Sequence, residues 1–166
     1  LDILDHIGPD KVLLVGSSMG GWIALLTLLE RAEKICGLIG LAAAPDFTGD
    51  LYAAKLTPEQ QDILDKEGQV SVPNDYSDEP YIFTKALFDD ARQNFLLNKD
   101  NTIEVPITLI QGMLDEDVPW EITARIQSAF KGERVDVVLI DNGDHRLSRP
   151  EDLKILRDQI TRHLGI

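Results

Sequence analysis

The chain has 166 residues, with 16 Lys and Arg against 29 Asp and Glu, which gives a formal net charge of -13. Hydrophobic residues make up 43% and charged residues 27%, a composition typical of a globular domain and not of a disordered or fibrous chain. The acidic balance argues against nucleic acid or an anionic membrane as a partner, because both select clustered Lys and Arg. No run reaches the roughly 18 apolar residues of a membrane helix, and the single cysteine, Cys36, excludes an internal disulfide and a cysteine-based metal site. We therefore expect a cytoplasmic protein that needs neither a cofactor nor a metal ion.

The first residues look like the end of an element whose beginning is missing. Residues 1–7 are amphipathic, and they start without a Met, a basic segment or a signal-peptide cleavage site. We expect them to form the last turns of a helix, and we expect the chain to be a fragment of a longer protein.

Short apolar runs alternate with helical patterns along most of the remaining chain. The expected strands are residues 11–15, 35–43, 107–111 and 135–140. The expected helices are residues 20–34, 120–130 and 150–163. The first run is apolar after Lys11 and predicts a strand buried on both faces. The alternation as a whole predicts an α/β fold, with about four parallel strands and flanking helices.

Residues 45–105 interrupt this alternation. The patterns within them predict helices at residues 50–56, 58–67 and 80–97, and a short strand at residues 70–72. About sixty residues are many more than the usual crossover between parallel strands contains. We expect a helical cap or lid over the carboxyl ends of the strands. An extended crossover without a functional role is the alternative.

The sharpest motif is the segment GSSMGG at residues 16–21. It matches G-x-S-x-G in one register only, with Ser18 at the centre, and it lies between an expected strand and an expected helix. A sharp turn there holds a serine in a strained backbone conformation, and the glycines two residues to either side are expected to prevent side-chain collisions. Ser18 is therefore the candidate nucleophile, and the Met19 N–H is the candidate oxyanion-hole donor. A turn without a chemical role is the alternative.

A serine hydroxyl is a poor nucleophile unless a base removes its proton. Of the three histidines, His6 and His163 lie in terminal helices, where a solvated or capping role is expected. His145 follows the fourth expected strand, in a loop that reaches the same edge of a parallel sheet as Ser18. His145 is therefore the candidate base.

Three carboxylates follow the third expected strand: Asp115, Glu116 and Asp117. Asp115 is the preferred acid because it comes first in the turn, whereas the other two are expected to cap the next helix or to face solvent. Asp115 would accept a hydrogen bond from the His145 ring, fix its tautomer and stabilise the imidazolium. The order Ser, Asp, His along the chain is that of the α/β-hydrolase fold.

From the serine motif to its end, the chain resembles the α/β-hydrolase superfamily. The resemblance depends on G-x-x-D-x-x-V-P at residues 112–119 and on G-D-H at residues 143–145. Within the superfamily, residues 111–113, 118–120 and 144–146 are similar to bacterial relatives of a mammalian mitochondrial palmitoyl-protein thioesterase, which also cleaves the acyl glucuronide of mycophenolic acid. The resemblance implies a serine hydrolase that cleaves carboxylic esters or thioesters through an acyl-enzyme and uses no cofactor.

The resemblance also implies strands that precede the serine motif and a second oxyanion donor that comes from them. Without those strands, the first strand of this chain would be an exposed edge. We expect the edge to pair with the rest of the polypeptide, with a separate chain or with a second copy.

The expected domains are residues 1–44, the half of the core with the serine motif, residues 45–105, the cap, and residues 106–166, the half with the acid and the histidine. Phe47 and Phe83 in the cap, with Trp120 at its rim, are candidates to contact the acyl group of a small-molecule or acyl-protein substrate. Ordinary packing within the cap is the alternative for the two phenylalanines. An inactive fragment that serves as an interaction module, and an aminopeptidase-like or lipase-like enzyme, are the other functions left open.

Overall fold

The computed structural model describes residues 2–7, 10–73, 78–132 and 134–166. Its contacts divide the chain into two compact units, one formed by Leu1–Pro45 with Leu96–Ile166 and the other by Asp46–Phe95. The first unit therefore also contains residues 96–105, which the sequence analysis assigned to the cap.

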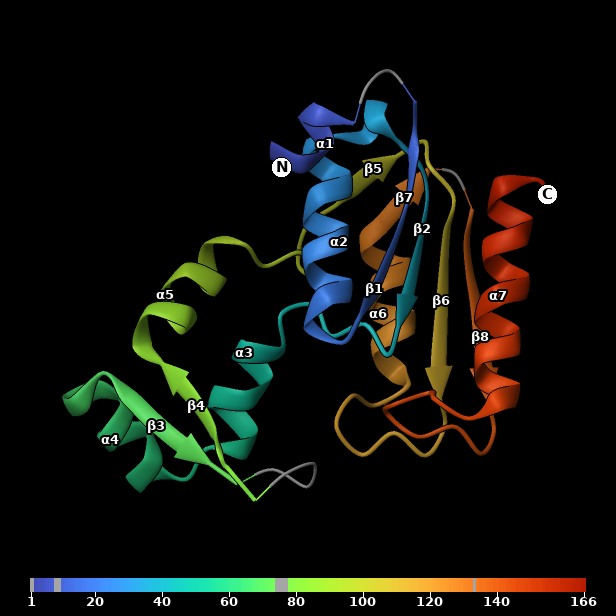
Figure 1. The fold of residues 1–166 in the computed structure, drawn as a ribbon. Coiled ribbons are helices and arrows are strands. Elements are labelled where there is room, and N and C mark those ends of the chain that lie inside the picture. Colours follow the sequence, from blue (N-terminus) through green and yellow to red (C-terminus); the bar gives the residue numbers. More distant parts are fainter. Residues whose placement is uncertain (1, 8–9, 74–77, 133) are drawn as a thin grey trace. The chain divides into compact units, whose positions relative to one another are not determined.

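A four-stranded parallel sheet forms the centre of the first unit (Figure 1). Its strands, in spatial order, are β1 (Val12–Ser17), β2 (Ile35–Leu41), β6 (Ile107–Gly112) and β8 (Val135–Ile140). One row across the sheet places Leu14 opposite Leu38, Leu38 opposite Ile107 and Ile107 opposite Val135. The four predicted strands and the α/β fold class are confirmed.

Helices cover both faces of this sheet. They are α2 (Met19–Glu30), followed by a short 3-10 helix, η1 (Ala32–Lys34), then α6 (Glu121–Ala129) and α7 (Pro150–Leu164). Figure 1 shows α2 on one face and α7 on the other. On the α7 side, Ile39, Ile110 and Ile140 form a buried cluster with partly buried side chains of α7, among them Ile155 and Leu156. This cluster fixes the strand ends that carry the candidate site.

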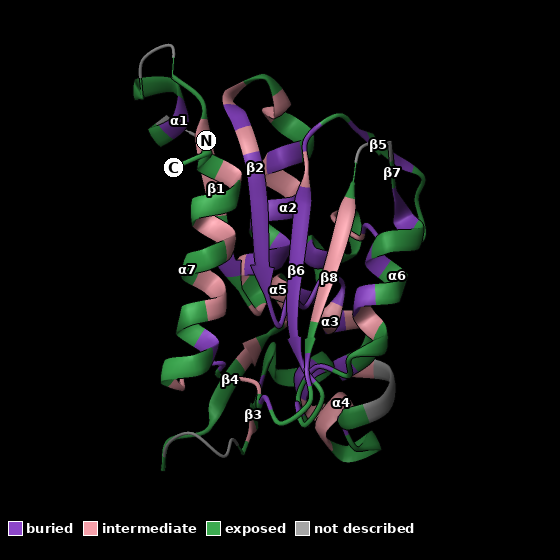
Figure 2. Ribbon diagram, turned by 90° about the vertical axis from the view of Figure 1, so that its right-hand side faces the viewer, coloured by how far each residue is buried: buried purple, intermediate pink, exposed green. Residues whose placement is uncertain are grey.

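Burial differs sharply between the inner and the outer strands (Figure 2). Every residue of β6 and all but one of β2 are buried, whereas β1 and β8 each contain a single buried residue. Val15 of β1 is 46% exposed. The prediction that β1 is buried on both faces is wrong, because β1 is an edge strand of the described sheet and pairs there only with β2.

The second unit is a small helical domain with one hairpin. Its elements are α3 (Phe47–Asp50), the π-helix η2 (Leu51–Lys55), α4 (Pro58–Glu67), β3 (Gln69–Val72), β4 (Tyr81–Thr84) and α5 (Lys85–Gln93). A capping box between Thr57 and Gln60 begins α4, and Gly68 ends it in the left-handed conformation with φ 78°. The core of the unit contains Leu64, Val70 and Phe88. The helix predicted over residues 80–97 is wrong at its start, because residues 81–84 pair with β3 as an antiparallel strand.

Three short elements complete the first unit. They are α1 (Asp2–His6) and a parallel pair of three-residue strands, β5 (Asn101–Ile103) and β7 (Phe130–Gly132). The buried Asn101 side chain fixes the β5 segment, since its Nδ2 donates to the carbonyls of Leu96 and Ala129. The sequence analysis did not predict β5 and β7. Among the described residues, no helix combines the length and the apolar character that crossing a membrane requires.

Candidate active site

Ser18 occupies the turn between β1 and α2, and its backbone is strained. Its φ is 52° and its ψ is -122°, a positive-φ conformation that costs a non-glycine residue on the order of 1–3 kcal/mol. Three backbone hydrogen bonds hold it there. The Ser18 N–H donates to the Leu41 carbonyl (2.9 Å), and the Ser18 carbonyl accepts from Gly21 (2.9 Å) and Ala44 (3.1 Å). Such an over-determined serine at a strand-to-helix turn is the geometry of a nucleophile elbow.

The glycines of the motif have unequal roles. A Cβ on Gly16 would lie 2.3 Å from the Gly20 carbonyl oxygen, and a Cβ on Gly21 would lie 2.6 Å from the Cβ of Ala43. A Cβ on Gly20 would meet nothing within 4 Å. The expectation that the glycines on both sides of Ser18 prevent collisions therefore holds for Gly16 and fails for Gly20. The close approach on the helix side is made by Gly21.

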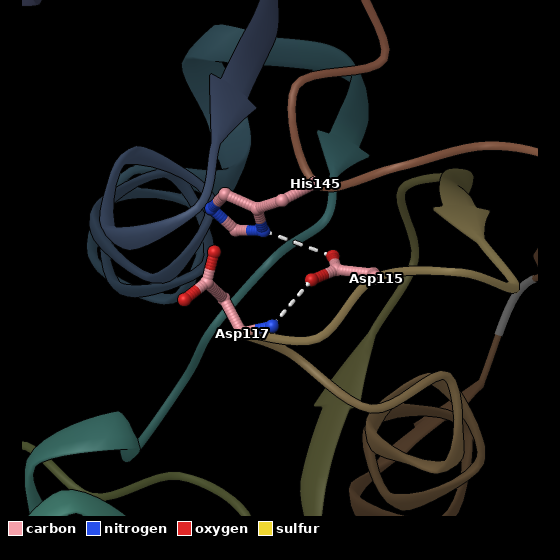
Figure 3. A group of neighbouring side chains, drawn as sticks. All are labelled: Asp115, Asp117 and His145. Atoms are coloured by element: carbon pink, nitrogen blue, oxygen red, sulfur yellow. Dashed lines mark hydrogen bonds and ion pairs between the residues drawn. The ribbon is translucent and has the colours of Figure 1, made fainter. Parts of the chain in front are cut away.

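Asp115 and His145 lie together at the carboxyl edge of the same sheet (Figure 3). Asp115 follows β6 and His145 follows β8, and the His145 Nδ1 lies 2.9 Å from the Asp115 Oδ2. Ser18 follows β1, which runs in the same direction as β6 and β8. All three side chains therefore belong to loops at one edge of the sheet, where parallel α/β proteins place their ligand sites.

The Asp115 and His145 loops are held together through two glycines. A Cβ on Gly112 would lie 2.3 Å from the Gly143 carbonyl oxygen, so the two backbones pass in direct contact. The Leu114 N–H donates to that same oxygen at 2.9 Å. Gly112 and Gly143 belong to the G-x-x-D and G-D-H motifs, and their lack of side chains permits the approach that places Asp115 beside His145.

Four donors surround the Asp115 carboxylate. Its Oδ1 accepts from the backbone N–H groups of Asp117 and Val118, both at 2.9 Å, and its Oδ2 accepts from Gln111 Nε2 at 2.8 Å in addition to the His145 contact. Gln111 is fully buried and also donates to the Val118 carbonyl. Sequence reasoning missed Gln111. The available signal was a single amide at the end of an otherwise apolar strand.

These contacts set the protonation of the pair. Burial opposes ionisation of Asp115, but the hydrogen bonds from His145, Val118 and Gln111 outweigh it and lower the pKa of the carboxyl. The hydrogen bond to Asp115 raises the pKa of His145 against the opposing effect of burial, and the charges of Asp115, Asp117 and Asp144 raise it further. An ionised Asp115 can only accept, so Nδ1 carries the proton and Nε2 of the neutral ring is a base.

Asp117 lies close to this pair, and the three side chains have the spacing of a cation site. One carboxylate oxygen of each aspartate and one ring nitrogen of His145 all lie within 4.8 Å of one another. A carboxylate has about four acceptor positions, and those of Asp115 are taken by the four donors described above. The donor set around Asp115 therefore fits proton transfer better than metal binding.

The other predicted residues fall in different places. Met19 is the first residue of α2, where the backbone N–H has no intrahelical acceptor. Trp120 is the N-cap residue of α6, so neither Glu116 nor Asp117 caps that helix, and both are exposed. Phe47 and Phe83 contact each other in the second unit, with ring centroids 6.5 Å apart.

The two remaining histidines lie away from these loops along the chain. His6 is in the last turn of α1. His163 is in the last turn of α7, where its Nε2 lies 2.9 Å from Thr108 Oγ1 and its ring packs against Gly37. Burial and the nearby Arg162 and Arg134 lower the pKa of His163. This histidine attaches α7 to the sheet, a packing role and not the solvated or capping role that the sequence analysis expected.

A strained serine after one strand and a hydrogen-bonded Asp–His pair after two later strands are the arrangement found in α/β hydrolases. The chain belongs to the alpha/beta hydrolase family, whose family profile matches residues 1–154.

The proteins similar to this chain include a mitochondrial palmitoyl-protein thioesterase. The chain is 35% identical over 161 residues to the mitochondrial palmitoyl-protein thioesterase ABHD10 of Mus musculus, and the match covers 94% of this chain and 52% of that protein. The solved structure of mouse alpha/beta hydrolase domain-containing protein 10 has a TM-score of 0.88 at 32% identity and is matched over 66% of its length, with 99% of this chain covered. The solved structure of a protein from Agrobacterium vitis S4 has a TM-score of 0.90 at 37% identity, with 97% of this chain and 64% of that chain covered.

The chain spans about half the length of the curated relatives it matches. The resemblance stated from the sequence is thus confirmed at the level of the family and of these relatives. The relatives are mitochondrial by name, so a cytoplasmic location for this chain stays a prediction.

Proposed function

We propose that this chain carries the catalytic residues of a serine hydrolase that cleaves carboxylic esters or thioesters, with Ser18 as nucleophile, His145 as base and Asp115 as its partner. The observation that supports it most directly is the Asp115–His145 hydrogen bond at the sheet edge to which the strained Ser18 turn belongs. The names of the similar proteins favour this reading over an inactive interaction module.

In the first half of the proposed reaction, Ser18 Oγ forms a bond to the acyl carbon while its proton moves to His145 Nε2. The Nδ1–H···Asp115 hydrogen bond stabilises the imidazolium that results. The Met19 N–H, at the positive end of α2, donates to the oxyanion of the tetrahedral intermediate. The bond to the leaving oxygen or sulfur then breaks, and Nε2 returns the proton to it.

In the second half, water replaces the leaving group. His145 Nε2 removes a proton from the water, whose oxygen adds to the acyl carbon of the acyl-enzyme. Collapse of this second intermediate breaks the bond to Ser18 Oγ, and the proton on Nε2 returns to the serine. The cycle needs no metal ion or organic cofactor.

The second unit offers apolar surface for an acyl group. A cavity of about 210 Å³ is lined there by Thr48, Gly49, Tyr52, Phe88, Arg92 and Phe95. Phe47 and Phe83 pack beside it in the same hydrophobic cluster as Phe88. We retain Phe47 and Phe83, with Trp120 of the first unit, as candidate acyl-contacting residues.

The outer edge of β1 is the proposed attachment point for the rest of the enzyme. Within the described residues β1 has a strand on one side only, and an unpaired strand edge tends to recruit another strand. Preceding residues of a longer polypeptide, a separate chain or a second copy would satisfy it, and a strand there could carry the second oxyanion donor. A stable monomer of this chain with a bare β1 edge would contradict this part of the proposal.

The proposal is tested by labelling with a fluorophosphonate, which reacts only with activated serines. The protein that carries this sequence is expected to be labelled, and Ser18→Ala is expected to abolish labelling. Ser17→Ala is the matched control, because Ser17 is adjacent and ends β1, and it should label like the wild type. Hydrolysis of p-nitrophenyl esters and acyl thioesters should show the same dependence. A folded wild-type protein without labelling, or labelling that survives in Ser18→Ala, would refute the proposal.

A further inference from the structure

A second carboxylate lies beside His145, and the proposed reaction assigns it no role. Figure 3 shows the Asp117 side chain next to the end of the His145 ring that carries Nε2, while Asp115 contacts Nδ1. A ring nitrogen of His145 and a carboxylate oxygen of Asp117 lie within 4.8 Å of each other. Asp117 is exposed, whereas His145 is half-buried.

The main chain holds Asp117 in place. Its N–H donates to Asp115 Oδ1 at 2.9 Å, and the next N–H, that of Val118, donates to the same oxygen at 2.9 Å. One tight turn therefore carries both carboxylates, and the buried Asp115 anchors it. The position of Asp117 relative to His145 follows from the hydrogen bonds that hold Asp115.

Three carboxylates act on His145: those of Asp115, Asp117 and Asp144, the last of which directly precedes His145 in the chain. The charge of Asp115 is shared among four donors, and Asp144 Oδ1 accepts from the Leu147 N–H at 3.0 Å. Asp144 thus supports its own loop. Asp117 is the carboxylate whose side chain lies at the Nε2 end of the ring, where the proton arrives.

We propose that Asp117 is a positioning residue that stabilises the Nε2-protonated imidazolium of His145 during each proton transfer. This inference depends on the proposed function, because Nε2 is the atom that takes the proton from Ser18 and returns it to the leaving group. No further proton is consumed or released, since Asp117 takes no proton from His145 or from Ser18 in either transfer. Its charge favours removal of the serine proton and slightly disfavours the return of that proton.

The size of the expected shift in the His145 titration midpoint follows from the distance between the Asp117 and His145 charges and from the exposure of Asp117 to solvent. Two unit charges roughly 5 Å apart in a water-like dielectric interact by enough to move the midpoint of a titration by about half a pH unit. Removing the charge of Asp117 makes His145 easier to deprotonate. Its neutral, basic form then persists to lower pH, and the midpoint of the acid limb of the activity profile moves to lower pH.

The test compares the pH dependence of Ser18-dependent fluorophosphonate labelling between pH 5 and 8 in the protein that carries this sequence. In Asp117→Asn the midpoint of the acid limb is expected about half a pH unit lower, so labelling below the midpoint becomes about threefold faster. Asp117→Glu retains the charge and is expected to keep a midpoint near that of the wild type. Glu116→Gln is the matched control, because it removes the same charge from the next exposed position of the turn and should leave the midpoint unchanged.

An NMR titration of the His145 ring, assigned by the loss of its signal in His145→Gln, gives a readout that does not need activity. If the wild type shows no Ser18-dependent labelling, the proposed function fails, and the NMR midpoint still decides the role of Asp117. An unchanged or higher midpoint in Asp117→Asn, or an equal shift in Glu116→Gln, would overturn the inference. If Asp117→Asn does not fold, a midpoint in Asp117→Glu that departs from the wild type by half a unit or more would overturn it instead.

Discussion

The two glycines that flank Ser18 should respond to alanine in opposite ways, although the G-x-S-x-G pattern treats them alike. Gly16 is the buried fifth residue of β1, and a Cβ there would lie 2.3 Å from the Gly20 carbonyl oxygen, 2.6 Å from its carbon and 2.8 Å from the Gly21 nitrogen. These are backbone atoms, so no side chain can rotate away. Gly20 lies in the first turn of α2 with open space around its Cα.

The expected magnitudes follow from these distances. Over-packing typically costs 1–3 kcal/mol, and three contacts with backbone atoms place Gly16→Ala at about 3 kcal/mol or more. In a protein of roughly 150–250 residues that loss lowers Tm by about 6–12 °C. Gly20→Ala adds no contact and reduces the freedom of the unfolded chain, a gain of up to about 0.5–1 kcal/mol within a helix. Its Tm should equal that of the wild type or exceed it by a few degrees.

Differential scanning calorimetry of the wild type and the two variants measures both effects. Fluorophosphonate labelling of the same samples reports whether the turn still presents Ser18, and we expect labelling to be lost in Gly16→Ala and kept in Gly20→Ala. Equal melting temperatures for the two variants would show that the close approach of β1 and α2 is not rigid. A lower Tm for Gly20→Ala than for Gly16→Ala would refute the reasoning altogether.

The remaining predictions concern the Asp–His pair. Asp115→Asn should lower the rate of Ser18-dependent ester hydrolysis by about 10³–10⁴-fold, because an amide cannot hold the His145 ring in the same tautomer. Steady-state kinetics measures this rate, and a near-wild-type value would remove Asp115 from the proposed site. Neutral His145 is the active form, and its pKa is raised above the ordinary 6.5. The rate of ester hydrolysis should therefore fall as the pH drops through a midpoint above 6.5. A midpoint below 6.5 would contradict the assignment of His145 as the base. Gln111→Leu should destabilise the fold by about 1–3 kcal/mol in chemical denaturation, because Asp115 and the Val118 carbonyl lose a buried donor; an unchanged stability would show that water replaces the amide.

The parts of the fold that were predictable from the sequence are those with a strong, uninterrupted pattern. The run that became β2 carries no polar side chain except the Cys36 thiol, and the run that became β6 is largely apolar, because the folded strands are buried on both faces. The strand β4 was missed because Thr84 is at once its last residue and the N-cap of α5, so no turn signal separates strand from helix. The three-residue strands β5 and β7 are too short for any period to emerge.

The site was predictable where a residue type and its place after a strand were sufficient. Asp115 and His145 each follow a strand closely, and the glycine two or three residues before each of them marks the backbone crossing. Gln111 was not predicted, because its function lies in a three-dimensional hydrogen-bond pattern, and the local signal, an amide near the end of a largely apolar strand, does not reveal its partners. The unequal roles of Gly16 and Gly20 were hidden for the same reason, since only the path of α2 past β1 decides which glycine is crowded.

The insertion of residues 46–95 between β2 and β6 bears on the order in which the protein acquires its structure during synthesis. The strand β2 leaves the ribosome long before its neighbour β6, so one side of a wholly apolar strand must wait without a hydrogen-bonded partner. Meanwhile the local contacts of the second unit, the hairpin β3–β4 and its helices, can already form. Closing the long segment between β2 and β6 is expected to be the slow step. Because doubling such a segment costs only about 0.6 kcal/mol, changes in the length of the insertion should alter how long β2 is exposed to aggregation far more than the final stability.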